Sequence, residues 1–221
     1  MRALAKAEDF SKIWNPQPKS PGIREKIKNT INPPPPLRQK LALALYKLKV
    51  QNNKLEYIIA KMKERDRALF EKVVQAQVEK DSTRAAMYAS EVAELRKLTK
   101  SLVMAKAAVE KVTLRLETIM VMGDVLVGLT PIVGVIKDLR RHLVGLVPEI
   151  GLEMAEIGEL LESVVTEAGE FSGFMSAPTV YNEETRKILE EAAAIAEQRM
   201  RTEFPELPSS FPQASPQQDN K

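Results

Sequence analysis

The sequence predicts an all-α protein built on one long antiparallel helical hairpin. Two hydrophobic stripes of about 40 residues each carry this prediction, together with a composition poor in glycine and aromatic residues. Of 221 residues, 9 are Gly, 5% are aromatic and none is Cys, whereas 29% are charged. Such a composition is typical of long helices and unfavourable for β-sandwiches or barrels.

The composition also argues against catalysis and metal chemistry. Because His142 is the one histidine and cysteine is absent, the chain lacks the usual nucleophile–histidine pairs and thiolate zinc sites. We therefore expect no enzymatic activity, no cofactor and no metal site. His142 is interpreted as an ordinary surface or interface residue, and the acids at 149, 153, 156 and 159 as a solvated helix face.

Residues 1–36 are predicted to be an amphipathic, basic segment that contacts membranes and ends in a Pro-rich spacer. Its helical start resembles an interfacial anchor, although a helix that packs on the rest of the protein fits the same stripe. The candidate membrane-binding residues here are Leu4, Phe10, Trp14, Arg24, Lys26 and Lys28. Four prolines at 33–36 form a stiff spacer before the next helix.

The first long stripe predicts a helix from Leu37 to about Lys80, which is ~65 Å long at 1.5 Å per residue. Its members alternate spacings of four and three: Leu41, Leu45, Leu48, Asn52, Leu55, Ile59, Met62, Asp66, Leu69, Val73 and Ala76. Such heptad spacing keeps one seam along one side of the helix. Asn52 and Asp66 are polar exceptions that either set the register or mark where the partner helix leaves room.

A second stripe follows a turn at 81–83, where Asp, Ser and Thr are cap-type residues. It consists of Tyr88, Val92, Leu95, Leu98, Leu102, Ala105, Val109, Val112, Leu116 and Ile119. The spacing from Val92 through Leu95 to Leu98 predicts a local stammer. Together the two helices make an antiparallel hairpin over about 37–122.

Beyond the hairpin, Gly and Pro at 123, 128, 131, 134, 145 and 148 are predicted to divide the chain into short helices over about 125–171. One of these begins at Pro148 and runs to about Glu170. The apolar run 118–136 contains Asp124 and Pro131, so it is interpreted as a buried helix with an elbow rather than a membrane span.

The remaining residues divide into two parts. Residues 172–203 are predicted to be a loop, Ser172–Tyr181, and an acidic regulatory helix from Asn182 or Glu183 to about Thr202. Residues 204–221 are rich in Pro, Ser and Gln and are expected to be disordered when free. The helical core is therefore assigned to 37–171.

Charge is distributed unevenly along the chain. Residues 1–111 hold 24 Lys and Arg against 12 Asp and Glu, whereas residues 112–221 hold 9 against 18. We interpret this as a basic surface for a polyanion, with an acidic region that folds over it; local excesses on solvated helices are the simpler alternative. The hairpin candidates for membrane binding are Lys47, Lys54 and Lys61. Without a nucleic-acid module, no specific nucleic-acid partner is expected.

This order of parts resembles the ESCRT-III family. The resemblance covers roughly residues 23–200, with the turn at 78–83 and a helix opening with Pro148, Glu149 and Ile150, like the family's fourth helix. The chain is most similar to archaeal members, the B-type subunits of the Cdv cell-division machinery. It resembles a shorter paralogue, with no room for a C-terminal winged-helix-like segment.

The tail resembles the motif by which ESCRT-III tails bind MIT domains of AAA ATPases. Residues 204–208 read Phe-Pro-Glu-Leu-Pro, which fits alternating apolar residues and prolines. Prolines preset an extended strand, so little entropy is lost on binding in a groove between helices. The candidate residues are Phe204, Pro205, Leu207, Pro208, Phe211 and Pro212.

The resemblance implies a cytoplasmic filament subunit, peripheral on the inner face of the cell membrane at the division site. It implies polymerisation with itself and paralogous subunits on anionic lipids, constriction or scission, and disassembly by an AAA ATPase through its MIT domain. Closed, the acidic region would cover the basic hairpin. The alternative is a non-enzymatic coiled-coil structural or tether protein, in which the first stripe makes an oligomer.

Overall fold

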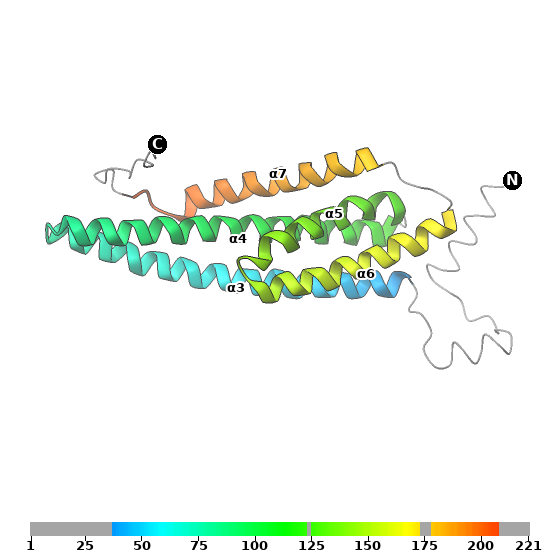
Figure 1. The fold of residues 1–221 in the computed structure, drawn as a ribbon, viewed down its shortest axis with the longest axis horizontal. Helices are drawn as coiled ribbons and strands as arrows, with labels where there is room; N and C mark the ends of the chain where they lie inside the picture. Colours follow the sequence, from blue (N-terminus) through cyan, green and yellow to red (C-terminus); the bar gives the residue numbers. More distant parts are fainter. Residues whose placement is uncertain (1–36, 123–124, 173–177, 208–221) are drawn as a thin grey trace, which may run out of the picture.

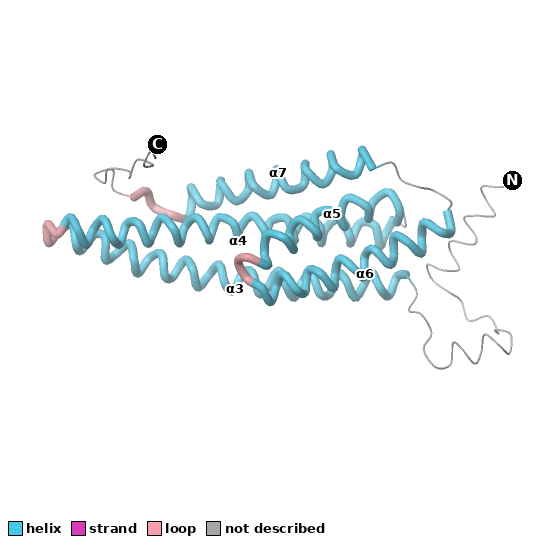
Figure 2. Tube along the Cα trace, viewed as in Figure 1, coloured by secondary structure: helices cyan, strands magenta, loops and turns pink. Residues whose placement is uncertain are grey.

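The computed structural model describes residues 37–122, 125–172 and 178–207 of the chain. In this part all regular secondary structure is α-helical, which confirms the predicted all-α class (Figure 2). The helices are α3 (Leu37–Val78), α4 (Ser82–Met122), α5 (Val125–Val144), α6 (Pro148–Ser172) and α7 (Pro178–Glu203).

Helices α3 and α4 form the long hairpin that runs the length of Figure 1. Leu41, Leu48 and Leu55 of the predicted seam are fully buried, as are Val92 and Leu116 on α4. The prediction from the heptad spacing of α3 is therefore confirmed: the seam residues lie on one side of this helix and face its partner in the hairpin.

The second stripe departs from its prediction at one position. Leu98 is 42% exposed, whereas Thr99 is fully buried. The predicted stammer is therefore wrong: Val92, Leu95, Thr99 and Leu102 continue the regular heptad. A threonine fits the seam because its hydroxyl donates to the Leu95 carbonyl oxygen at 2.8 Å, which satisfies the buried polar group.

The tight turn between α3 and α4 is fixed by a backbone cap at the end of α3 and a side-chain cap at the start of α4. Lys80 adopts a left-handed conformation with φ of 58°. The Lys80 amide donates to Gln77 and the Asp81 amide to Ala76, the hydrogen-bond pattern of a Schellman C-cap. The Asp81 carboxylate then accepts from the Arg84 amide at 3.0 Å, so it caps α4 as predicted.

Helices α5 and α6 form a second, shorter antiparallel pair that covers the open half of the hairpin (Figure 1). The turn between them is closed by the Val147 amide, which donates to Leu143 at 2.7 Å. Pro148 begins α6 as predicted. Pro131 does not end a helix, however: it lies inside α5, so the division of the chain predicted at this proline is wrong. The predicted elbow at 123–131 holds only at its start, because α4 ends at Met122 and α5 begins at Val125.

Helix α7 lies along α4 and also packs against α5. It begins at Pro178, inside the predicted loop and before the predicted start at 182 or 183. The reason is that proline is tolerated in the first turn of a helix, where its missing N–H has no intrahelical acceptor. A buried hydroxyl secures α7 on α5, because Thr185 donates to the Pro131 carbonyl oxygen at 3.2 Å.

The apolar interior has two parts. The main core is shared by all of the described helices and includes Leu116, Ile136 and Ile157. A separate small cluster of Val73, Ala89 and Val92 lies farther along the hairpin, toward its turn. Among the described helices, none combines the length and apolarity needed to cross a membrane.

Candidate interaction surfaces

A row of ion pairs joins α6 to α3. Lys54 Nζ lies 2.7 Å from Glu149 Oε1, and Lys47 contacts Glu156 and lies 3.6 Å from Glu153. Lys40 pairs with Glu167 farther along α6. The order of partners is reversed between the helices, so α6 runs antiparallel to α3 with its acids over the basic side of the hairpin.

These contacts shift the pKa values of both partners in the directions expected for attraction. The hydrogen bond from Lys54 is the main cause that lowers the pKa of Glu149, and in turn raises the pKa of Lys54. The pKa of Lys47 is raised chiefly by its hydrogen bond to Glu156. The side chains of these two pairs are 28–74% exposed to solvent, so each pair by itself contributes little to stability.

Helix α7 repeats the arrangement on the other side. Lys111 of α4 contacts Glu191, and its hydrogen bond is the main cause that lowers the pKa of that carboxyl. Arg115 lies 3.4 Å from Glu184. Acids from both C-terminal helices therefore contact bases of the hairpin.

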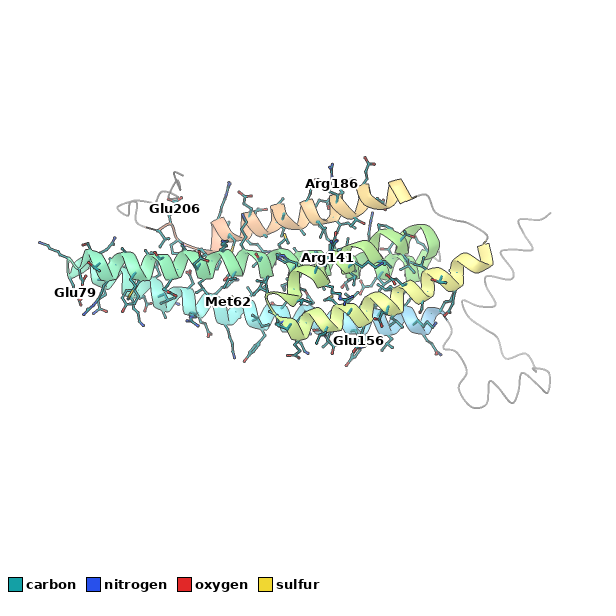
Figure 3. All side chains as sticks on the ribbon, in the orientation of Figure 1. Met62, Glu79, Arg141, Glu156, Arg186 and Glu206 are labelled. Carbon is teal, nitrogen blue, oxygen red and sulfur yellow. The ribbon has the colours of Figure 1, made fainter. Side chains whose placement is uncertain are left out.

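The candidate membrane-binding residues of α3 do not share one environment. Lys47 and Lys54 face acids of α6, whereas Lys61 lies over the Tyr57 ring at 4.5 Å from its centroid. Figure 3 shows Glu156 on α6 alongside α3. For Lys47 or Lys54 to exchange its acidic partner for a lipid headgroup, its contact with α6 has to break. The remaining candidates, Leu4, Phe10, Trp14, Arg24, Lys26 and Lys28, lie outside the described residues.

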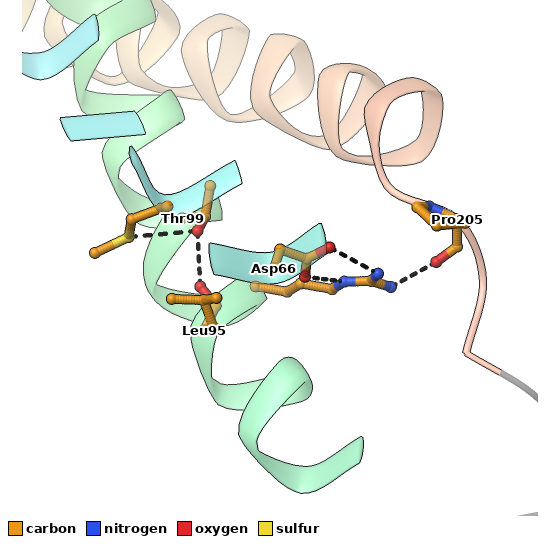
Figure 4. Close-up of polar contacts among 6 residues, drawn as sticks. Asp66, Leu95, Thr99 and Pro205 are labelled. Carbon is orange, nitrogen blue, oxygen red and sulfur yellow. Dashed lines mark hydrogen bonds and ion pairs between the residues drawn. The ribbon is translucent and has the colours of Figure 1, made fainter. Parts of the chain in front are cut away.

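The start of the tail motif lies against the hairpin. Phe204 is only 8% exposed, and Arg96 of α4 donates through Nη1 to the Pro205 carbonyl oxygen at 2.6 Å. Arg96 also holds Asp66 through two hydrogen bonds of 2.7 and 3.0 Å (Figure 4). Asp66, the polar exception in the seam, therefore positions the arginine that contacts the tail.

Leu207 completes the contact. It packs on the small cluster of Val73, Ala89 and Val92, beside Tyr88. Pro208, Phe211 and Pro212, the other candidates of the motif, lie outside the described residues. The structure thus brings Phe204, Pro205 and Leu207 together on one part of the hairpin.

Sequence reasoning missed the hairpin side of this contact. Arg96, Phe70 and Tyr88 surround the tail, yet none belongs to a recognisable motif. The available signal was Asp66, because a buried carboxylate needs a charged or hydrogen-bonding partner. The sequence alone does not say which of the many basic residues supplies it.

The remaining polar candidates lie where they contact protein or solvent. Glu149, Glu153 and Glu156 contact lysines of α3, and His142 is exposed. In the described ranges no group of three or more His, Asp or Glu side chains is arranged to hold a metal ion.

The structure is that of an all-α hairpin protein in which two acidic helices of the same chain, α6 and α7, contact basic residues of the hairpin. Comparison with curated proteins gives 44% identity to Cell division protein B1 of Sulfolobus acidocaldarius over 206 residues, 92% of each chain. Cell division protein B of that organism is 38% identical over 162 residues, 73% of this chain and 62% of that protein. The chain therefore belongs to the Cdv B-type subunits of the ESCRT-III family, as the sequence predicted.

A third relative extends the set. Cell division protein B3 of the same organism is 24% identical over 169 residues, 76% of this chain and 96% of that protein. No family model and no solved structure matches the chain.

Proposed function

We propose that this chain is a filament subunit that polymerises on anionic membranes and drives constriction or scission in archaeal cell division. The relatives in Sulfolobus acidocaldarius are named cell division proteins, which supports a role of this chain in cell division. The proposed role is carried out by binding and assembly, without a catalytic residue. It takes place on the inner face of the cell membrane, with paralogous subunits as partners.

The observation that carries this proposal is the row of lysines under α6. Lys40, Lys47 and Lys54 repeat every seven residues, so they lie on one side of α3 and all pair with acids of α6. A basic residue near an anionic surface contributes about 1 kcal/mol of binding free energy. An exposed ion pair contributes ~0–1 kcal/mol. Lipid headgroups can therefore compete with the acids of α6 for these lysines.

Assembly makes this competition effective. A single subunit with a few accessible lysines binds weakly, but subunits joined in a filament bind the same surface together and gain avidity. Release of α6 and α7 also uncovers apolar side chains of the main core for contact with a neighbouring subunit. Covered and uncovered forms of the hairpin therefore differ in both lipid binding and assembly.

Removal from the membrane is assigned to an AAA ATPase that binds the tail through its MIT domain. Phe204, Pro205 and Leu207 supply two apolar side chains separated by a proline-stiffened backbone. Such a segment fits a groove between helices with little loss of conformational entropy.

The alternative role, a coiled-coil tether, has less support. The main observation in its favour is the apolar seam of α3, which has to be buried against another helix. That partner is α4 of the same chain, since Leu41, Leu48 and Leu55 are fully buried within the hairpin. The seam therefore does not require a second chain.

The test combines sedimentation with anionic liposomes and negative-stain microscopy. Full-length protein is compared with protein truncated after Met175, which removes α7 and the tail. We expect filaments or tubulated membranes, with more of the truncated protein bound. Neutral liposomes and high salt serve as controls, because screening weakens contacts between lysines and headgroups. Discrete oligomers that form equally with and without liposomes would overturn the proposal and favour the coiled-coil tether protein.

A further inference from the structure

Helix α3 carries a second apolar stripe on a side that α4 does not cover. Its members recur at spacings of three, four and seven residues and therefore share one side of the helix: Leu43, Tyr46, Val50 and Tyr57. Leu43, Tyr46 and Tyr57 are 47%, 66% and 61% exposed. Exposed apolar side chains gathered on one helix face, with tyrosine among them, are typical of a contact surface. This side of α3 is therefore a candidate binding surface.

A groove of about 540 Å³ lies at this stripe, between α3 and the turn from α5 to α6. Its apolar lining comes from both sides of the groove and consists of Val50, Tyr57, Ile58, Val147 and Ile150. The volume is within the range of pockets that bind ligands, and a mainly apolar lining is typical of them. The groove can therefore receive large apolar side chains.

The chain itself has an apolar segment that can reach this groove. Residues 1–36 lie outside the described residues and lead directly into Leu37, where α3 begins. Val50 and Tyr57 lie 13 and 20 residues beyond Leu37, which is ~20 and ~30 Å along the helix. Residues 15–36 span up to ~68 Å as a polyproline-type chain. Phe10 and Trp14, the aromatic residues of the predicted amphipathic stripe, are therefore within reach of the groove.

The path from the groove back to Leu37 has complementary charge. Lys54 pairs with Glu149 at the groove and Lys40 pairs with Glu167, so α6 runs beside α3 from the groove to the start of α3 (Figure 1). Residues 148–172, which form α6, hold seven acids and no Lys, Arg or His. Residues 15–36 hold four Lys and Arg against one acid. A connection that follows α6 therefore places a basic segment beside an acidic helix.

A second copy of the chain fits the stripe less well. Residues 37–67 of α3 hold nine Lys and Arg against three acids. Two copies that met through this side of α3 would therefore bring two basic helices together, and like charges placed opposite each other weaken an interface. Charge favours the N-terminal segment as the occupant.

We infer that this groove is the docking site of the chain's own N-terminal segment, Met1–Trp14, and that Phe10 and Trp14 leave it when the segment enters a membrane. Because the same side chains serve both places, docking and membrane insertion exclude each other. The membrane step rests on the proposed function, whereas docking does not. The apparent affinity of the segment for lipid is lowered in proportion to the fraction that is free of the groove.

Trp14 is the chain's one tryptophan, so its fluorescence reports on this segment alone. Its accessibility is measured by acrylamide quenching of the full-length protein without lipid, with a peptide of residues 1–22 as the accessible reference. We expect the quenching constant of the protein to be about threefold smaller than that of the peptide, which corresponds to about two thirds of the segments docked. A protein as accessible as the peptide would overturn docking.

Variants of α3 test whether the groove is the site. Tyr57→Ser removes an exposed ring from the lining and Val50→Lys adds a charge to it, so either should raise the quenching constant toward that of the peptide. Val74→Ser is the matched control, because it replaces a 42% exposed apolar residue of the same helix near the hairpin turn, and it should change nothing. Circular dichroism melting establishes that each variant remains folded.

Two results would overturn the assignment of the groove to this segment. Protection of Trp14 that survives both groove variants would mean that the segment docks elsewhere. Protection that increases with protein concentration, together with a larger mass in light scattering, would mean that a second copy is the occupant.

Liposome binding separates this inference from the proposed function. With about two thirds of the segments docked, Tyr57→Ser should bind anionic liposomes up to about threefold more tightly, whereas Val74→Ser should not. Equal binding by both, with Trp14 protected in the unaltered protein, would overturn the competition with the membrane. Accessible Trp14 in a protein whose liposome binding requires Met1–Trp14 would refute docking, although the proposed function would stand. If no variant binds liposomes, the proposed membrane role is wrong, and the quenching result still decides docking.

Discussion

Lys54 on α3 and Glu149 at the start of α6 form a 2.7 Å ion pair that joins these two helices across 95 residues of sequence. Lys47 and Lys40 continue the same row toward the start of α3. The acids of these pairs are solvent-accessible and each pair contributes little, so the attachment of α6 to the hairpin depends on several small electrostatic contributions together with its buried apolar side. Such an attachment can respond to a competing anionic surface.

Reversing one charge in this row should favour lipid binding. Glu156→Lys replaces the attraction to Lys47 with repulsion, and we expect a two- to fivefold gain in liposome-bound protein, the factor that corresponds to ~0.4–1 kcal/mol. The control is Glu159→Lys, which changes the net charge equally. Glu159 is exposed and is not among the acids that contact α3 in the described part of the chain. Equal gains for both variants would mean that net charge, rather than release of α6, governs binding.

The same row of ion pairs predicts that the attachment of α6 to α3 depends on pH, with a lower and an upper limit. The pKa of Glu149 is lowered from 4.5, so its attraction to Lys54 is complete above that value and is lost as pH falls through the lowered pKa. The pKa values of Lys47 and Lys54 are raised from 10.5, so their contribution is complete below that value and is lost as pH rises through the raised pKa. Attachment of α6 should therefore be constant near neutrality and weaken at both extremes.

Energy transfer between dyes on cysteines at Tyr46 and Glu159, both exposed, measures the attachment. We expect transfer to fall below pH 4.5 and to recover on return to neutral pH. Glu149→Gln is the control, because it removes one of the titrating carboxylates and should reduce the change on the acid side. Unchanged transfer down to pH 3 would contradict an electrostatic attachment.

The sequence predicted the hairpin well because its seam is a local, repeated pattern. Each turn of α3 supplies one seam residue, all of them apolar except Asn52 and Asp66, and period alone places these residues on one side. Pro131 shows the limit: whether a proline ends a helix or lies inside it depends on the helices that pack around it, here α4, α6 and α7. The start of α7 was misplaced too, because Pro178 was assigned to the predicted loop Ser172–Tyr181 although it begins the helix.

The hairpin side of the candidate tail site was beyond sequence reasoning for a physical reason. Asp66, Arg96 and Pro205 are separated by 30 and 109 residues, and no periodic pattern relates them. A polar residue in an apolar seam indicates that a partner exists, but only the packing of α3 on α4 identifies it. The tail residues themselves were recognisable, because proline alternating with apolar residues is a local signal.

The tail motif makes a direct prediction for ATPase binding. Phe204→Ala with Leu207→Ala should weaken binding to the MIT domain at least tenfold, because two buried apolar side chains are lost, and should leave polymerisation intact. Binding is measured by calorimetry with both the full chain and the isolated tail peptide. The peptide is needed because, in the full chain, the same substitutions also free the tail from the hairpin, which could hide the loss of affinity for the MIT domain. Glu206→Ala, between them and exposed, should bind normally. Unchanged affinity of the double variant would dismiss the motif.

The N-terminal segment, which lies outside the described residues, is tested by deletion. Removing Met1–Trp14 should lower liposome binding more than filament formation, because Phe10 and Trp14 are predicted to insert in the membrane interface. Sedimentation with liposomes and microscopy of filaments measure the two effects on the same protein. Equal loss of both would indicate that the segment packs on the rest of the subunit instead.

The contact between α5 and α6 predicts opposite effects for two glycines of α6. A Cβ on Gly151 would lie 2.6 Å from Val144 Cγ2 and 2.8 Å from the Val144 backbone nitrogen, so the turn would have to shift. We expect Gly151→Ala to lower stability by about 1–3 kcal/mol. A Cβ on Gly158 would meet Ile136 Cγ2 at an ordinary 3.5 Å. Gly158→Ala should therefore gain up to ~1 kcal/mol from helix propensity.

Thermal unfolding followed by circular dichroism distinguishes the two variants. For a chain of this size, 1 kcal/mol shifts the midpoint by about 2–4 °C, so Gly151→Ala should melt several degrees lower and Gly158→Ala slightly higher than the unaltered protein. Each variant is the other's control, since both place the same methyl group on one helix. If α6 packs on α5 through a different side, the two substitutions should have similar effects. A lower midpoint for Gly151→Ala alone would support the close approach of α6 to Val144, which fixes where Glu149 and Glu156 meet the lysines of α3.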